Sequence, residues 1–177
     1  MNLQKLFEVQ AGLDYHITKE HPVKEGEDRL SKKILALQVE LGELANEWRG
    51  FKFWSNDQKP RREKIHYSIA GIPLRKSDPL LEEYVDCLHF LLSIGLESEI
   101  GTFTGDELMP IKMGTIEIQF ITIFKATVTF LEDISYYQEM WELFLGLGEM
   151  LGFSWEEVEQ AYMEKNRINH QRQLNHY

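Results

Sequence analysis

The feature that most constrains the fold is a run of apolar residues separated by alternating steps of four and three. The run consists of Leu30, Ile34, Leu37, Leu41, Leu44, Trp48 and Phe51. An α-helix places residues with this spacing on one face, and that face must be buried against another element. The run therefore predicts a long amphipathic helix that packs against the rest of the chain.

Helical spacing recurs along most of the sequence. We expect further helices at 2–19, 80–97, 116–131 and 134–151, and a last one opened by Ser154 and Glu157, which match the Ser-x-x-Glu form of a capping box. The β-branched stretch 115–133 begins with strand-like alternation, but it also fits a helix and has no clear partner strand. Five to six helices without convincing strands predict an all-α helical bundle, most simply one domain spanning 1–177.

Residues 55–79 interrupt the helical pattern. They contain three of the five prolines and six Lys or Arg residues, with no sustained period. We expect a long loop or insertion there, which is basic within an acidic protein.

Charge and composition narrow the functional classes. The net charge is −10, with 29 acidic residues against 19 Lys and Arg, which argues against a general nucleic-acid binder. The most apolar stretch, 116–131, contains charged residues and is shorter than the ~20 residues of a membrane span. A single cysteine, Cys87, and the lack of a secretory signal predict a soluble, cytoplasmic protein.

Two expected helices each carry a pair of acids three residues apart, Glu40 with Glu43 and Glu83 with Asp86. If the helices are antiparallel neighbours, four carboxylates share a small volume and need cations to neutralise them. Oxygen-only ligands select hard ions, so Mg²⁺ is expected, with Mn²⁺ as a substitute. Metal-bound phosphate chemistry is the prediction, and solvated helix faces are the alternative that these pairs alone leave open.

A family resemblance adds to this interpretation. The strings ELGELANEWRGFKFWS and LEEYVDCLHF, with LFEVQAGLD near the start and YMEKNRINHQRQLNHY at the end, closely resemble the dimeric, all-α dUTPases. Those enzymes belong with the MazG-like nucleotide pyrophosphohydrolases. The resemblance touches most of the chain and implies a homodimer with a nucleotide substrate.

The resemblance also implies roles for individual residues. Two or more magnesium ions would be held by Glu40, Glu43, Glu83 and Asp86, with Glu47 and Glu82 as further candidates. The candidates for packing on or reading the uracil base are Gln10, Asp14, Phe53 and Trp54. The candidates for contacts with phosphate and sugar are Lys52, Tyr162, Lys165, Asn166, Asn169 and Arg172.

Each of these roles has a simpler alternative. Phe53 and Trp54 could be core aromatics, Gln10 and Asp14 an exposed helical pair, and Lys165 and Arg172 a complement to the dipole of their helix. His89, one turn after Asp86, is expected to support the site without binding metal, because hard oxygen sites rarely use imidazole.

The resulting hypothesis is hydrolysis of dUTP to dUMP and diphosphate, with dUDP as a further candidate substrate. Metal ions would neutralise the phosphate chain and activate a water, and Glu40 and Glu43 are the candidate catalytic carboxylates. One rival is a related pyrophosphohydrolase acting on dCTP or other nucleoside triphosphates. The other is a non-catalytic helical adaptor whose apolar stripes form an oligomer interface.

Overall fold

Helices dominate the computed structural model, which describes residues 2–100 and 107–175. They are α1 (Leu3–Glu20), α2 (Arg29–Trp48), α3 (Pro79–Glu97), α4 (Ile116–Glu132), a 3₁₀ turn η1 (Ile134–Tyr136), α5 (Tyr137–Met150) and α6 (Trp155–Leu174). The predicted all-α class is confirmed, including the helical state of the β-branched stretch that became α4.

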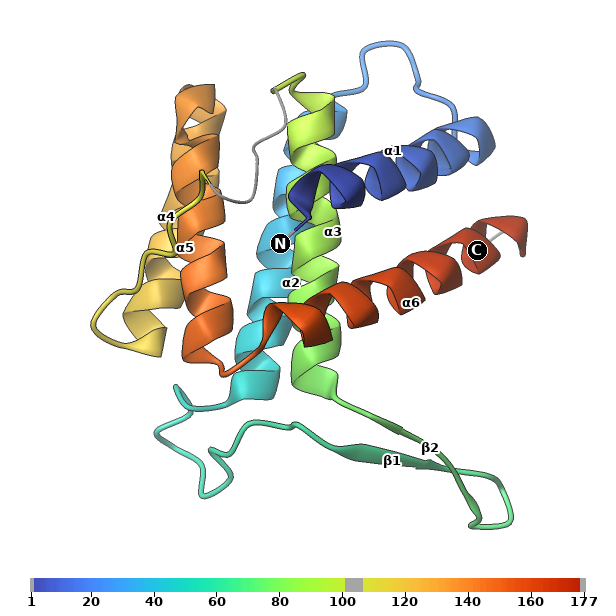
Figure 1. The fold of residues 1–177 in the computed structure, drawn as a ribbon, viewed down its shortest axis with the longest axis vertical. Helices are drawn as coiled ribbons and strands as arrows, with labels where there is room; N and C mark the ends of the chain where they lie inside the picture. The colour runs from blue at the N-terminus through green and yellow to red at the C-terminus, as the bar shows by residue number, and fades with distance from the viewer. Residues whose placement is uncertain (1, 101–106, 176–177) are drawn as a thin grey trace.

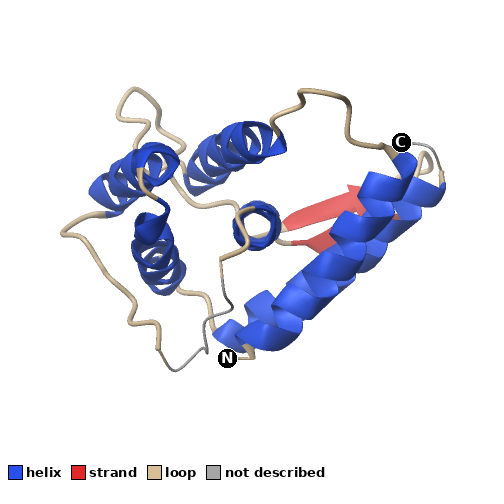
Figure 2. Ribbon diagram, turned by 90° about the horizontal axis from the view of Figure 1, so that it is seen from above, coloured by secondary structure: helices blue, strands red, loops and turns tan. Residues whose placement is uncertain are grey.

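The antiparallel pair α2 and α3 forms the centre of the molecule (Figure 1). Helices α4 and α5 pack along one side of this pair, while α1 and α6 lie side by side and extend away on the other (Figures 1 and 2). Residues from all six helices share one buried apolar cluster. On that side α1 and α6 contact each other, and both contact α3.

The sequence of α2 explains its limits. The Asp28 side chain caps the first turn by accepting from the Ser31 amide at 3.0 Å. Ile34, Leu37, Leu41, Leu44 and Trp48 are buried, as the spacing predicts. The helix ends at Arg49, which takes a left-handed conformation with φ 66°. The predicted run of helical apolar residues was therefore one residue too long, since its last member, Phe51, lies beyond the helix and is partly exposed.

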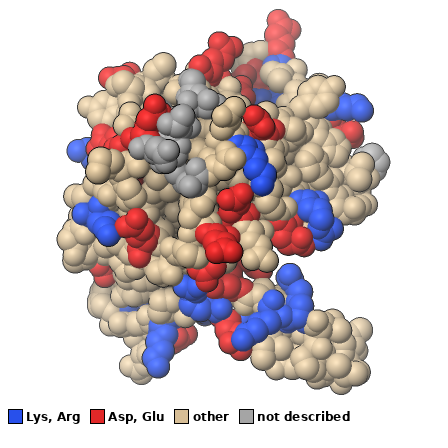
Figure 3. Space-filling view, viewed as in Figure 1, with Lys and Arg blue, Asp and Glu red and all other residues tan. Residues whose placement is uncertain are grey.

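The expectation of a loop over 55–79 was wrong in part, because this segment contains an antiparallel hairpin. Strand β1 (Lys64–Tyr67) pairs with β2 (Pro73–Ser77), with Lys64 opposite Ser77. The turn is closed by the Ser68 amide donating to the Ile72 carbonyl, and Gly71 supplies a positive φ of 75°. In the space-filling view the hairpin stands apart from the helices, with a notch between them (Figure 3).

The later helices largely follow the predicted limits. The expected helix at 134–151 divides into η1 and α5, and the Ser154–Glu157 capping box is present at the start of α6. No helix among the described residues is long and apolar enough to cross a membrane.

Candidate active site

The antiparallel packing of α2 on α3 brings acids from both helices together. Glu40 and Glu43 of α2 and Glu83 of α3 each place one carboxylate oxygen within 4.8 Å of the others. These three residues are called here the acidic cluster, and Glu83 lies 40 positions after Glu43 in sequence. The cluster joins the two predicted pairs at three of their four members.

Two carboxyls of the acidic cluster have raised pKa values. The pKa of Glu40 is raised to about 7, first by burial and then by the nearby charges of Asp86 and Glu43. The pKa of Glu83 is also raised to about 7, by burial and then by Asp86, Glu43 and Glu40. Two carboxyls that hold protons this tightly favour either a proton or a cation at the cluster.

Asp86, the fourth predicted metal ligand, lies on α3 one turn after Glu83. Burial raises its pKa, and the Lys165 ammonium opposes that rise. Lys165 comes from α6 and its Nζ contacts Asp86 Oδ2 directly, with both side chains about one-fifth exposed. The alternative that Lys165 merely complements the dipole of its helix is therefore wrong.

Glu47 and Glu82, the two further candidates, lie outside the acidic cluster. Glu47 Oε1 accepts from Arg61 Nη1 at 3.2 Å, whereas its buried Oε2 has no hydrogen-bond partner among the described residues. Glu82 carries a charge that raises the pKa of Asp86.

A cavity of about 520 Å³ opens beside the cluster, between α1, α2, α3 and α6. Glu40 of α2 and Asp86 of α3 line this cavity, and so do Asn169 and Arg172 of α6. Gln10, Asp14 and His89 form another part of its wall. The cavity thus joins acids suited to a cation with cationic and amide groups suited to an anion.

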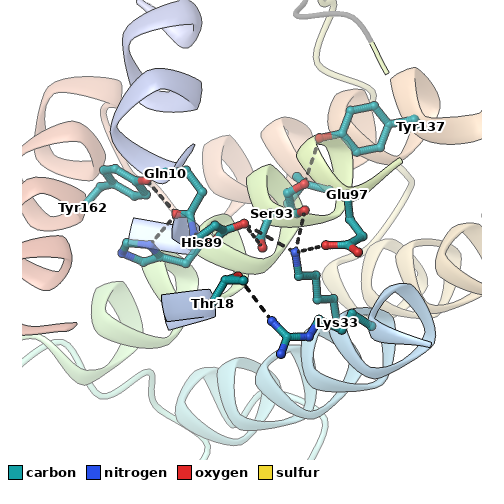
Figure 4. Close-up of polar contacts among 11 residues, drawn as sticks. Gln10, Thr18, Lys33, His89, Ser93, Glu97, Tyr137 and Tyr162 are labelled. Carbon is teal, nitrogen blue, oxygen red and sulfur yellow. Dashed lines mark hydrogen bonds and ion pairs between the residues drawn. The ribbon is translucent and has the colours of Figure 1, made fainter. Parts of the chain in front are cut away.

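A hydrogen-bonded group in this wall is centred on Gln10 (Figure 4). Gln10 is 2% exposed, so the alternative of an exposed helical pair with Asp14 is wrong. Its Oε1 lies 2.8 Å from both His89 Nδ1 and the Tyr162 hydroxyl, and its Nε2 donates to Asp14 Oδ1 at 2.7 Å. The rings of His89 and Tyr162 stack with centroids 4.2 Å apart.

The same wall continues from Asp14 to α2 and α3. Asp14 Oδ2 accepts from the Ser93 hydroxyl at 2.5 Å and lies 3.4 Å from Lys33 Nζ. Lys33 also donates to Glu97 Oε2 at 2.7 Å and to the Ser93 carbonyl at 3.3 Å (Figure 4). A part-buried carboxylate paired with an ammonium in this way holds α1 against α2 and α3.

The predicted base-packing and phosphate residues after α2 lie elsewhere. Phe53 is 86% exposed and Trp54 is 65% exposed, with their rings edge-to-face at 5.0 Å, so neither is a core aromatic. Lys52 Nζ contacts Asn46 Oδ1. None of the three lines the cavity described above.

On α6 the predicted residues divide between the cavity and the core behind it. Tyr162 is fully buried, and Asn166 is buried with its Nδ2 unpartnered among the described residues. Asn169 Oδ1 lies 3.4 Å from Arg172 Nη1 at the cavity wall.

Comparison with known proteins identifies the family of the chain. A family model described as dUTPase matches residues 2–72 and 73–177, which is nearly the whole chain. The chain belongs to this dUTPase family. It is therefore a dUTP diphosphatase, a nucleotide pyrophosphohydrolase of predominantly helical fold. A search of curated proteins found no match.

Membership of the dUTPase family implies use of a divalent metal, and the residues present fit such an ion. The acidic cluster supplies only carboxylate oxygens, from two packed helices, and burial followed by the neighbouring carboxylates raises the pKa of Glu40 and of Glu83. Hard divalent cations prefer this donor set.

Sequence reasoning missed Lys33 in the wall of this dUTPase. A signal was available, because Lys33 precedes Glu40 by seven residues and so lies two turns away on the same helix face. Ser93 and Glu97 also share the helix face of Asp86, at i+7 and i+11. What the spacing did not show is that Asp14 would join them.

Proposed function

We propose that this enzyme hydrolyses dUTP to dUMP and diphosphate in the cavity between α1, α2, α3 and α6, and that it depends on Mg²⁺. The observation that carries the proposal is the acidic cluster beside a cavity whose α6 wall supplies Asn169 and Arg172. Binding a triphosphate requires both a metal site and cationic side chains. The acidic cluster and the α6 wall of this cavity provide the two next to each other.

Glu40, Glu43 and Glu83, with Asp86, are the residues that would hold the metal, and two or more ions are proposed. Mn²⁺ is a substitute because it accepts the same oxygen ligands. When bound, such ions neutralise phosphate charge and lower the pKa of a water.

The proton acceptor is proposed to be a carboxylate of the α2 pair. Glu40 is the better placed, because it belongs to the acidic cluster and also lines the cavity. It can orient an attacking water and accept its proton. Glu43 is exposed and lies one turn further along α2, where it can share that task.

The phosphate and sugar contacts are assigned to α6 and its neighbourhood. Arg172 and Asn169 line the cavity, and Lys165 lies at the acids. Tyr162 and Asn166 form the buried layer behind them, while Lys52 is a more distant candidate for the phosphate chain.

Base selection is assigned first to Gln10. Only one of its two amide protons is used among the bonds of the described residues, in the contact with Asp14. The second can donate to the uracil O4, where cytosine carries an amino group that would face it as another donor. Asp14 holds the amide in place, and the exposed pair Phe53 and Trp54 offers faces on which a base can stack.

The enzyme is proposed to act as a homodimer. Exposed apolar side chains on α2 and α4 support this proposal, because burying them against a second copy removes them from water. They include Leu35, Val39, Ile121, Val128 and Leu131. Light scattering that gives the mass of one chain would contradict it. The cytoplasmic location stays a prediction.

Hydrolysis of a nucleotide panel tests the function. With Mg²⁺ we expect dUTP to be preferred over dCTP, dTTP and UTP, with dUDP as a second substrate and no turnover in EDTA. Preference for dCTP would overturn the substrate assignment, and no metal-dependent turnover at all would favour the adaptor.

Two variants locate the chemistry. Glu43→Gln should lower kcat by at least 100-fold with the helical circular dichroism unchanged. The matched control is Glu164→Gln, because Glu164 is an exposed acid of α6 that pairs only with Arg167 among the contacts described. It should retain full activity.

A further inference from the structure

Lys165 occupies an unusual position for a residue expected to bind phosphate. Its ammonium contacts Oδ2 of Asp86, one turn from Glu83 of the acidic cluster, and the two paired residues come from α6 and α3, 79 positions apart. Both side chains are about one-fifth exposed. The contact is therefore a largely desolvated ion pair between two helices, not a transient pair on the surface.

The charge of Lys165 extends beyond Asp86. It also lowers the pKa of Glu40 and of Glu83, against the effects that raise them. One ammonium thus acts on three carboxyls, Asp86, Glu40 and Glu83. It performs part of the neutralisation that a divalent ion would perform at the same oxygens.

An ammonium and a divalent cation repel each other when both face the same carboxylate oxygen. A metal that uses Asp86 must therefore displace Lys165 from Oδ2 or bind against its charge. The lysine side chain is long and flexible enough to leave, with a compact charge that can contact a new partner. Asn169 and Arg172 lie one and two turns further along α6 and line the cavity. We therefore expect the new partner of the ammonium to lie in this cavity.

We propose that Lys165 is an exchangeable cation. It neutralises Asp86 while divalent metal is absent, leaves that carboxylate when the metal binds, and then contacts the phosphate chain of the nucleotide. The phosphate half of this proposal rests on the proposed function, whereas the exchange at Asp86 does not.

Exchange couples the two binding events. Metal frees the ammonium that phosphate needs, and phosphate holds the ammonium away from the acids that the metal needs. Because such coupling is reciprocal, metal should tighten nucleotide binding and nucleotide should tighten metal binding by the same factor. Lys165 competes with metal in the free protein and assists it in the nucleotide complex.

The decisive experiment measures Mn²⁺ binding to the full chain without nucleotide, from the electron paramagnetic resonance signal of free Mn²⁺. Lys165→Met removes the competing charge and should tighten Mn²⁺ binding by about tenfold. The matched control is Arg167→Met, which removes a cation of the same helix that pairs with exposed Glu164. Its Kd for Mn²⁺ should change by less than about twofold.

An unchanged or weaker affinity in Lys165→Met would overturn the exchange. If that variant does not fold, the parent protein provides the test through reductive methylation of its lysines, read by peptide mass spectrometry. Lys165 should be labelled several times faster in Mg²⁺ than in EDTA, with Lys33, which is tied to Asp14 and Glu97, as the internal reference. Equal labelling of Lys165 in the two conditions would overturn the proposal.

A third measurement separates this proposal from the proposed function. An imido analogue of dUTP that resists hydrolysis should tighten Mn²⁺ binding in the parent and lose most of that effect in Lys165→Met. If the analogue does not bind while Lys165→Met still tightens Mn²⁺, the nucleotide function fails and the exchange stands. If the analogue tightens Mn²⁺ equally in both proteins, the phosphate half of the proposal fails.

Discussion

His89 Nδ1 lies 2.8 Å from Gln10 Oε1, and this contact fixes which ring nitrogen carries the proton. Because Gln10 Nε2 is committed to donating to Asp14, its oxygen faces His89 and can only accept. Burial lowers the pKa of His89 to about 3, so the ring is neutral near pH 7. We expect the Nδ1–H tautomer, with Nε2 as an unprotonated acceptor. ¹⁵N NMR at pH 7 distinguishes the two ring nitrogens directly.

The source of that tautomer can be tested with two variants. Gln10→Leu removes the acceptor, so the Nε2–H form should become populated. Asp14→Asn keeps an oxygen for Gln10 and should leave the tautomer unchanged. A protonated Nε2 in the parent protein would contradict the arrangement of the whole wall.

The acidic cluster should make the protein less stable at high pH when metal is removed. The pKa of Glu83 rises from 4.5 to about 7 on folding, so its favourable contribution is complete below pH 4.5 and is lost as pH rises through 7. Glu83→Gln has no such group and should lose less stability over that range. At pH 8 in EDTA its melting temperature should exceed that of the parent by about 2–4 °C, which corresponds to about 1 kcal/mol after discounting for solvent screening.

Added Mg²⁺ supplies the reverse comparison. The parent should gain stability from the ion, whereas Glu83→Gln, which lacks one proposed ligand, should gain less. A parent melting temperature in EDTA that does not fall between pH 5 and pH 8 would show that these carboxyls carry no excess charge.

Local spacing predicted most of the helices, and its limits are equally clear. Residues from Leu30 to Trp48 specify α2 because each buried side chain recurs at a helical interval. The two acid pairs could be recognised for the same reason. The hairpin was missed because KIHY and PLRKS are short, and an alternation over four or five residues is weak evidence for strands.

The wall of the cavity lay beyond sequence reasoning for a different reason. The contacts of Gln10 with Tyr162 and of Asp14 with Ser93 join residues 152 and 79 positions apart. No local pattern indicates which helix faces will meet, because that depends on the packing of the entire bundle. Spacing could nominate Gln10 and Tyr162 separately, but not as hydrogen-bonded partners.

Gly95 of α3 should tolerate no side chain. A Cβ there would lie 2.1 Å from the hydroxyl of buried Tyr137, which donates to the Leu91 carbonyl at 2.8 Å. Gly95→Ala should therefore cost about 2 kcal/mol, or about 4–8 °C in melting temperature. Gly42→Ala is the matched control, because that glycine of α2 has no atom within 4 Å of its Cβ position. It should be neutral or stabilising by up to about 1 kcal/mol. Equal destabilisation of both variants would argue against close packing of α3 on α5.

The exposed aromatic pair after α2 should affect substrate binding without affecting stability. Trp54 is 65% exposed, so Trp54→Ala should change the free energy of unfolding by less than about 0.5 kcal/mol. If a uracil base stacks there, the loss of one stacking partner, worth about 1–3 kcal/mol, should raise the KM for dUTP by about fivefold or more. Tyr67→Ala is the control, since Tyr67 is a similarly exposed aromatic, 59% accessible, on the hairpin. Its KM should equal that of the parent. An unchanged KM in Trp54→Ala would show that the base does not stack on Trp54. Base binding would then be attributed to the cavity wall around Gln10 alone, because no contribution from the aromatic pair would be needed.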